Sequence, residues 1–180
     1  LESMTADTAW LREFVRDIPD FPEPGVMFKD ISPLLANVDA FRFSVDALAD
    51  HWCGDSSDHI LGIEARGFLF AAPLAYRCGA GFVPVRKPGK LPADTASQTY
   101  DLEYGTDAIE IHSDAIAAGE RVVIIDDVLA TGGTAAATVE LVRGLGAQVV
   151  GLGFVIELGF LGGSGKLEEY ETTSLLLYDQ

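Results

Sequence analysis

Basic residues, cysteines and long apolar runs are all scarce in this chain of 180 residues, and each shortage argues against a class of protein. The apolar runs are short and interrupted, so no segment is expected to cross a membrane. The first residues show no basic region followed by an apolar core, so no signal peptide is expected. Twelve Lys and Arg against 28 Asp and Glu give a net charge of −16. This argues against nucleic acid as the main partner, because binding a phosphodiester backbone requires a basic face.

The two cysteines, Cys53 and Cys78, form neither a CxxC motif nor a larger framework. Such usage is typical of a reduced, cytoplasmic setting and predicts two ordinary, partly buried thiols. The three histidines lack the spacing of a zinc site, so the protein itself is not expected to hold a metal ion. Leu1, Glu2 and Ser3 precede Met4, and we expect them to be a cloning remnant.

What the chain does contain is the composition of one folded domain over residues 1–180, with 48% apolar and 22% charged residues. Strand-like and helix-like patterns alternate from residue 59 to residue 157. The strand-like runs are continuous and rich in Val and Ile. This predicts an α/β fold with a mainly parallel sheet covered by helices on both faces.

Local patterns predict the individual elements, with Asp39 as a helix cap and Gly79 closing a helix. Helices are expected at residues 5–18, 39–52, 67–79 and 134–146. Strands are expected at residues 59–63, 81–87, 108–112, 121–127, 147–157 and 174–178, the last at a sheet edge. The Pro-rich residues 20–33 are expected to form a loop with some extended structure, and the long polar residues 91–105 a lid.

The most informative stretch is RVVIIDDVLATGGT (121–134), an apolar strand that ends in Asp126 and Asp127. In a parallel sheet, ligands collect at the carboxyl ends of the strands. The following loop has small residues, hydroxyl groups and a helix N-terminus, which together suit a phosphate group. The loop has Thr134 where a nucleoside triphosphatase would have Lys, and no GxGxxG follows a strand, so those two nucleotide-binding classes are disfavoured.

A ribose 5-phosphate explains why two acids stand beside a phosphate loop. Ionised carboxylates accept hydrogen bonds from two adjacent hydroxyl groups, although they would repel a phosphate. The 5-phosphate would then lie in the loop and the 2- and 3-hydroxyls on Asp126 and Asp127. The alternative is that one Asp caps the loop and the other is merely solvated.

This stretch resembles the phosphoribosyl-pyrophosphate (PRPP) motif of type I phosphoribosyltransferases. FPEPGVMFKDISPLL, GIEARGFLF, VPVRKPGKLP and YDLEYGTDAIEIH are similar to segments of the bacterial adenine phosphoribosyltransferases, so the resemblance runs from about Asp20 to Leu158. It implies that adenine and PRPP give AMP and pyrophosphate, with Mg²⁺ carried by PRPP, in purine salvage. It also implies a homodimer and a Rossmann-like core under a small hood, formed largely by residues 20–35 and the C-terminal segment.

The resemblance also implies the roles of individual residues. Arg66 and Asp127 would act in catalysis, and a cis peptide bond is expected near Glu64–Ala65. The PRPP and AMP site would comprise Asp126, Asp127, Ala130, Thr131, Gly132, Gly133 and Thr134. The pyrophosphate site would comprise Arg66, Arg86, Lys87 and Lys90, in part across the dimer interface. Taken alone, Arg86 and Lys87 could equally be a solvated strand end.

Recognition of the base is expected from Met27, Phe28 and Lys29, with Leu158 on the other face of the adenine. Phe28 offers an aromatic face for stacking, although it could instead tie the loop to the core. In the lid, Glu103 matches the family's acid–base carboxylate, and Tyr104 is expected to help close the site.

Two other functions stay open on the sequence alone. One is a phosphoribosyltransferase for another purine or a pyrimidine. The other is a PRPP-sensing regulator, which the acidic chain and its short N-terminal segment disfavour because DNA binding requires a basic module.

Overall fold

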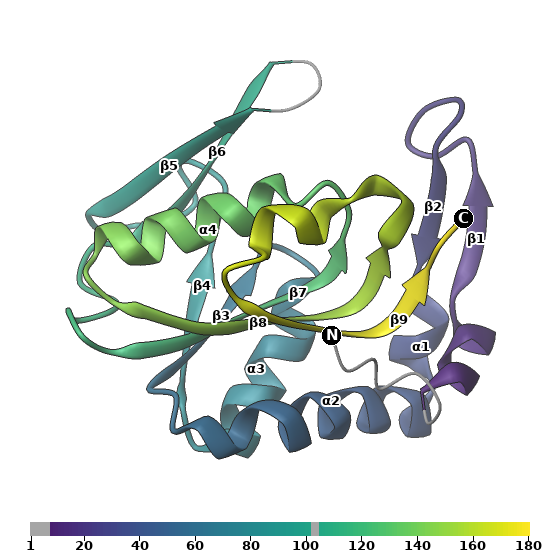
Figure 1. Ribbon diagram of the computed structural model, residues 1–180, viewed down its shortest axis with the longest axis horizontal. Helices are drawn as coiled ribbons and strands as arrows, with labels where there is room; N and C mark the ends of the chain where they lie inside the picture. The colour runs from purple at the N-terminus through teal and green to yellow at the C-terminus, as the bar shows by residue number, and fades with distance from the viewer. Residues whose placement is uncertain (1–7, 102–104) are drawn as a thin grey trace.

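The computed structural model describes residues 8–101 and 105–180, and its centre is a five-stranded parallel sheet (Figure 1). The strand order is β4-β3-β7-β8-β9, and every neighbouring pair is parallel. The bounds of these strands are β3 His59–Ile63, β4 Gly81–Val85, β7 Arg121–Leu129, β8 Gln148–Leu158 and β9 Glu171–Tyr178. The predicted parallel sheet is therefore confirmed, and so is the edge position of the last strand.

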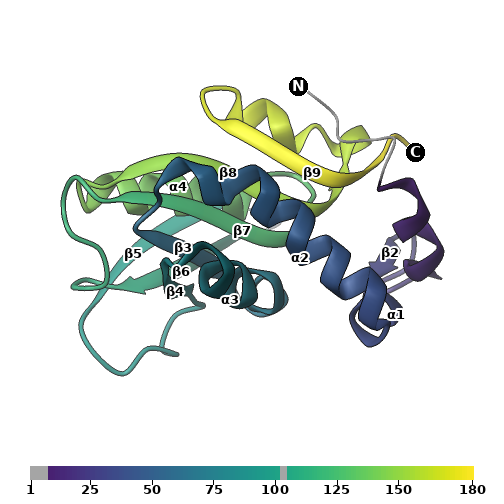
Figure 2. The ribbon, with the colours of Figure 1, turned by 90° about the horizontal axis from the view of Figure 1, so that it is seen from below.

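Helices cover both faces of this sheet, as predicted (Figure 2). α2 (Val38–Trp52) and α3 (Gly67–Cys78) pack on one face, and α4 (Gly133–Gly144) packs on the other. Side chains along β7 alternate between the two layers: Val123 and Ile125 join the α2 and α3 side, whereas Val122 and Ile124 join the α4 side. This alternation is the ordinary period of a strand. It explains why β7 is apolar at every position from Val122 to Ile125.

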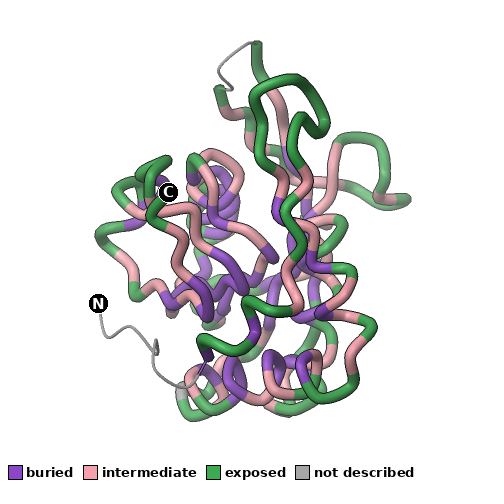
Figure 3. Tube along the Cα trace, turned by 90° about the vertical axis from the view of Figure 1, so that its right-hand side faces the viewer, coloured by how far each residue is buried: buried purple, intermediate pink, exposed green. Residues whose placement is uncertain are grey.

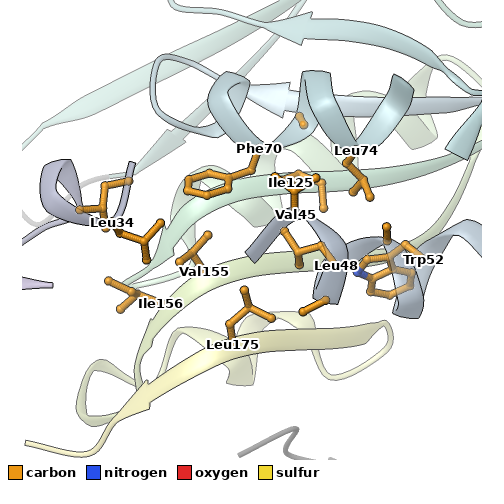
Figure 4. Packing of buried hydrophobic residues seen from close by; sticks show 14 of the residues in the cluster. Leu34, Val45, Leu48, Trp52, Phe70, Leu74, Ile125, Val155, Ile156 and Leu175 are labelled. Atoms are coloured by element: carbon orange, nitrogen blue, oxygen red, sulfur yellow. The ribbon is translucent and has the colours of Figure 1, made fainter. Parts of the chain in front are cut away.

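The core on the α2 side is closely packed around Trp52, Phe70 and Leu74 (Figure 4). Trp52 is fully buried, and its ring lies where a Cβ atom on Gly151 would be. β8 therefore needs a glycine at this point so that the indole can lie flat against its backbone. α2 begins after Asn37, whose side chain accepts from the N–H groups of Asp39 and Ala40. The prediction that Asp39 is the cap was wrong by two residues.

A two-stranded hairpin stands beside the carboxyl end of the sheet (Figure 1). It pairs β1 (Arg16–Pro19) with β2 (Met27–Asp30), and it is flanked by η1 (Ala9–Phe14) and α1 (Ser32–Ala36). The prediction of one helix over residues 5–18 was wrong for residues 8–18, the part that the structure describes, because a short 3₁₀ helix forms there and the chain then turns into β1. The apolar spacing is helical, but pairing with β2 determines the structure of residues 16–19.

A second hairpin projects on the other side of the molecule and corresponds to the predicted lid. It pairs β5 (Thr95–Asp101) with β6 (Thr106–His112) in an antiparallel register from Thr95↔His112 to Asp101↔Thr106. The expected irregular lid at residues 91–105 was therefore wrong for the part that forms β5. The residues of β5 are all partly or fully exposed (Figure 3). The strand therefore lacks the apolar alternation by which a strand is predicted from sequence.

The prediction of two free thiols was also wrong. Cys53 and Cys78 form a disulfide, with their Cα atoms 4.7 Å apart. Cys53 begins η2 (Cys53–Asp55) directly after α2, and Cys78 is the last residue of α3. The two packed helices thus bring together cysteines that are 25 residues apart, which spacing alone did not reveal. Within the described residues, no helix is long and apolar enough to cross a membrane.

Candidate active site

A cleft of about 560 Å³ lies at the carboxyl ends of β3, β7 and β8, where the sequence predicted the ligand. Five segments line it: the β1–β2 hairpin, the turn after β3, the segment after β4, the end of β7 with the following loop, and the end of β8 with the turn that follows it. Among the predicted site residues, those that line the cleft are Met27, Phe28, Lys29, Arg66, Lys87, Asp126, Asp127, Ala130, Thr134 and Leu158. Segments from residue 27 to residue 158 therefore converge on one space, as predicted.

Asp126 and Asp127 lie within β7, which continues two residues further than predicted, to Leu129. α3 begins so close to β7 that a Cβ atom on Gly67 would stand 2.9 Å from Oδ1 of Asp126. Burial and the adjacent Asp127 charge raise the pKa of Asp126 well above its ordinary value. Asp126 therefore keeps its proton to a higher pH than an ordinary carboxyl group does.

Asp127 has a cationic partner. Its side chain is only 6% exposed and forms an ion pair with Arg66, which is 46% exposed. Arg66 precedes α3, and its guanidinium carbon lies 5.1 Å from the centre of the Phe28 ring. The peptide bond between Glu64 and Ala65 is cis, as the resemblance implied. Arg66 thus joins the acidic pair to the hairpin wall of the cleft.

The predicted phosphate loop surrounds a smaller cavity of about 80 Å³ that shares residues with the cleft. Gly132 has a φ of 76°, a left-handed conformation that favours glycine, and it precedes α4. A Cβ atom on Gly132 would also overlap the carbonyl oxygen of Gly163 in η4 (Gly163–Leu167). Thr131, Gly132 and Gly133 line this smaller cavity. The C-terminal part of the chain therefore braces the loop backbone to backbone.

The cations beyond β4 are divided between the cleft and its surroundings. Arg86 forms an ion pair with Glu64 at 3.0 Å and does not line the cleft, and neither does Lys90. Lys87 lines it, and its ammonium group contacts Asp107 and the Tyr100 hydroxyl, the latter at 2.9 Å. The structure thus gathers Arg66 and Lys87 in one cleft and leaves Arg86 and Lys90 outside it.

Lys87 belongs to a network that sequence reasoning missed. The Tyr100 hydroxyl lies 3.1 Å from Asp107 and also accepts a hydrogen bond from Thr134 at 3.2 Å. Burial alone would lower the pKa of Lys87, but the hydrogen bonds that its ammonium group donates to Asp107 and Tyr100 outweigh this effect and leave the pKa raised. The hydrogen bond from Lys87 lowers the pKa of Asp107. Tyr100 lies on β5 and Asp107 on β6. Because the sequence did not predict β5, the contact of these residues with Lys87 was not expected.

The hairpin wall of the cleft combines an aromatic ring with polar backbone. Phe28 is partly buried, and its ring stands edge-on to Phe21 with 5.1 Å between their centres. The Lys29 side chain is 8% exposed and points to Asp17, 2.7 Å away. Leu158, at the end of β8, lines the same cleft. Ile63, Glu64, Ala65, Val128 and Leu161 also line it and were not predicted.

The predicted lid residues Glu103 and Tyr104 lie outside the described residues. A separate hollow of about 670 Å³ lies between the end of α2 and the segment from η4 to β9. Its described lining includes His51, Glu168 and Glu171 but neither Lys nor Arg. A phosphate-bearing ligand is therefore better matched by the cleft at β7, which is lined by Lys29, Arg66 and Lys87 and by the loop.

This fold, with an acidic pair beside a phosphate-type loop, defines a phosphoribosyltransferase, and the phosphoribosyl transferase domain family matches residues 30–174. Adenine phosphoribosyltransferase of Thermobifida fusca is 56% identical over 173 residues, which cover 96% of this chain and 98% of the relative. The relative from Acaryochloris marina is 55% identical over 93% of this chain and 99% of its own length. The chain belongs to the phosphoribosyltransferase family and, within it, to the adenine phosphoribosyltransferases.

Solved structures agree with this assignment. The adenine phosphoribosyltransferase of Thermoanaerobacter pseudethanolicus superposes with a TM-score of 0.92 at 54% identity, covering 95% of this chain and 99% of that one. The Saccharomyces cerevisiae enzyme has a TM-score of 0.89 at 43% identity, with coverages of 94% and 98%. That structure is a complex with an imino-altritol bisphosphate and adenine.

Proposed function

We propose that the cleft at the end of β7 is where this adenine phosphoribosyltransferase joins adenine to PRPP, giving AMP and pyrophosphate. One observation carries the proposal: a single cleft of about 560 Å³ holds an acidic pair, a phosphate-type loop, the cations Arg66 and Lys87 in addition to Lys29, and an aromatic wall. Each feature matches one part of the reactants. The acids match the ribose hydroxyls, the loop the 5-phosphate, the cations the pyrophosphate and the aromatic wall the base.

In this reaction N9 of adenine forms a bond to C1 of the ribose while the bond from C1 to the pyrophosphate oxygen breaks. The residues mainly align the reactants and stabilise the charge that develops on the leaving group. Asp126 and Asp127 hold the ribose, residues 130–134 hold the 5-phosphate, and Arg66 and Lys87 face the pyrophosphate. Glu103 takes the N9 proton, and Tyr104 closes the lid. Both of these roles remain predictions from the family resemblance.

Adenine lies against Phe28, between the β1–β2 hairpin and Leu158. Backbone groups of Met27 and Lys29 recognise its edge, because fixed donors and acceptors distinguish a 6-amino from a 6-oxo purine. The orientation of Lys29 favours backbone recognition, since its side chain is buried against Asp17 instead of reaching into the cleft.

Magnesium enters as part of the substrate, bound to PRPP. Mg²⁺ keeps several of its waters and is commonly held through substrate phosphates. The described carboxylates of the cleft suit the ribose side, and Arg66 and Lys87 suit the pyrophosphate side. The metal would neutralise the pyrophosphate together with these two cations.

The direct test is AMP formation from adenine and PRPP, followed by chromatography with and without Mg²⁺. Hypoxanthine, xanthine and uracil serve as competing bases. We expect AMP only with adenine and Mg²⁺ present. Equal or better use of hypoxanthine would contradict the adenine assignment.

Replacing Phe28 tests the position of the base. Stacking contributes on the order of 1–3 kcal/mol per base, so Phe28→Ala is expected to raise KM for adenine by about tenfold or more. KM for PRPP should change little. Phe160→Ala is the control, because Phe160 is 53% exposed and does not line the cleft. If Phe28→Ala leaves KM for adenine unchanged, the base binds elsewhere.

A further inference from the structure

The β1–β2 hairpin needs an anchor if it is to hold adenine in one place. A two-stranded hairpin is at best marginally stable in water, yet this one carries Met27 and Phe28 into the cleft. Asp17 and Lys29 are directly opposite each other in its register, and their ion pair of 2.7 Å joins the two strands. That pair holds the hairpin together but does not fix it to the sheet.

Arg66 links Phe28 to Asp127 of β7, and a second connection to the sheet is made by Tyr178, the last residue of β9. The Lys29 ammonium group lies 4.2 Å from the centre of the Tyr178 ring, and the Arg12 guanidinium carbon lies 4.5 Å from it. Arg12 also donates a hydrogen bond to the carbonyl oxygen of Leu177. An aromatic face attracts cations, and more strongly where water is excluded. Lys29 is 8% exposed, so its contact with the ring is of the stronger kind.

Tyr178 also lies next to the opposite wall of the cleft. In the β8–β9 register it lies beside Leu158, which lines the cleft across from the hairpin. One residue thus contacts Lys29 on the hairpin and pairs with Leu158 on the sheet. Both Lys29 and Leu158 belong to the proposed adenine site.

We propose that Tyr178 is a positioning residue for adenine, which sets the distance between the hairpin and the end of β8 through its cation-binding ring. The inference rests on the proposed function. It gives a role to the C-terminal strand, for which the sequence indicated none. The ring is the essential group, because both cations lie over it. Burial raises the pKa of Tyr178, so the side chain stays neutral near neutral pH.

The test compares Tyr178→Leu, which removes the ring, with Tyr178→Phe, which keeps it. A partly desolvated cation–π contact corresponds to about a fivefold to tenfold change in affinity. We therefore expect Tyr178→Leu to raise KM for adenine by that factor, with KM for PRPP and kcat within about twofold of wild type. Tyr178→Phe should restore KM for adenine. Tyr170→Leu is the control, because it removes a tyrosine ring that lies outside the cleft.

A merely structural role would lower the melting temperature without this split between the two KM values. The proposal is overturned if Tyr178→Leu leaves KM for adenine unchanged, if it raises both KM values equally, or if Tyr178→Phe is as impaired as Tyr178→Leu. Should Tyr178→Leu fail to fold, Arg12→Met tests the same ring from its other cation, and an unchanged KM for adenine would again overturn the proposal. A wild-type protein that forms no AMP would refute the proposed function instead.

Discussion

Asp126 and Asp127 are neighbours in the chain but have different electrostatic surroundings. Asp127 is paired with Arg66, whereas Asp126 is partly buried beside the start of α3 and has the Asp127 charge next to it. Burial and a like charge both disfavour the ionised form. The acidic pair is therefore costly in the free protein, and it is expected to become favourable when ribose hydroxyls donate hydrogen bonds to it.

Asp126→Asn is expected to stabilise the free protein and weaken PRPP binding. A carboxyl group whose pKa is raised on folding binds its proton more tightly in the folded state. Its contribution to stability is therefore present below the unfolded pKa of about 4 and is lost as the pH rises through the folded pKa. The gain from Asp126→Asn should be absent near pH 4 and grow toward neutral pH. Thermal melting across this range measures it, and KM for PRPP should rise by about tenfold.

Asp127→Asn is the matched control, because it removes the partner of Arg66 and leaves the same shape. It should lower stability by about 1 kcal/mol, a modest value because Arg66 is nearly half exposed. Opposite signs for the two variants would separate their roles. If Asp126→Asn destabilises the protein at neutral pH as much as Asp127→Asn does, the asymmetry between the two acids is wrong.

At the scale of elements, buried Ile109 and Ile111 of β6 pack the β5–β6 hairpin against the sheet, and a few polar contacts add to this attachment. Lys87 follows β4, Tyr100 and Asp107 lie on the hairpin, and Thr134 lies in the first turn of α4. The network therefore joins three elements next to the residues proposed for pyrophosphate and the 5-phosphate. A ligand that contacts Lys87 and Thr134 would compete for the same groups that fix the hairpin.

Asp107→Asn is expected to loosen this hairpin while the sheet stays intact. The pKa of Asp107 is lowered and that of Lys87 is raised, so their pair stabilises the fold from about pH 4 to about pH 10 and is lost on either side. Both side chains are about one-third exposed, so the expected loss is only about 0.5–1 kcal/mol. Amide hydrogen exchange should accelerate in β5 and β6 but not in β3 or β7. Unchanged exchange in the hairpin would show that the network does not hold it.

The elements that the sequence predicted best are those whose pattern and environment agree. Apart from Asp127 and Thr138, β3, α3, β7, α4 and β8 are apolar where they are buried, and glycine closes α3 at Gly79 with a φ of 68°. β1 and β5 depend on pairing with the next strand, and the Cys53–Cys78 disulfide depends on the packing of two helices, which the pattern of each segment alone does not reveal. The same division holds in the cleft. The loop and the acids were predicted, whereas Tyr100 and Asp107 required the hairpin pairing to be known.

For the whole molecule, the net charge of −16 makes the placement of the few cations decisive. Arg66, Arg86 and Lys87 are each paired with a carboxylate of the protein itself. These pairs hold the cations near the cleft in an otherwise acidic protein. When pyrophosphate binds, it replaces these carboxylates as the anionic partner of the cations. Such an exchange costs less than bringing the cationic side chains together from solvent.

We also propose that the chain forms a homodimer through the face made by α3 and the edge strand β4. Leu69 and Tyr76 are seven residues apart on α3, so they lie on one side of the helix. They are 43% and 89% exposed, and Phe82 on β4 is 37% exposed. Arg86 lies beside this face, with its guanidinium carbon 6.0 Å from the centre of the Phe68 ring. A second copy covering this face would bury the apolar side chains and bring its Arg86 toward the interface.

Tyr76→Glu is therefore expected to yield a monomer, because it places a charge where an apolar contact is proposed. Light scattering coupled to size-exclusion chromatography measures the mass, starting from a wild-type dimer. Val38→Glu is the control, since Val38 is also exposed, at 65%, but lies at the start of α2. If Arg86 acts on the active site of the partner subunit, the Tyr76→Glu monomer should also lose activity. Mixing it with the Asp127→Asn variant, which we expect to be inactive, should not restore activity, because Tyr76→Glu cannot form the interface. A wild-type monomer, or a Tyr76→Glu variant that stays dimeric while Val38→Glu dissociates, would place the interface elsewhere.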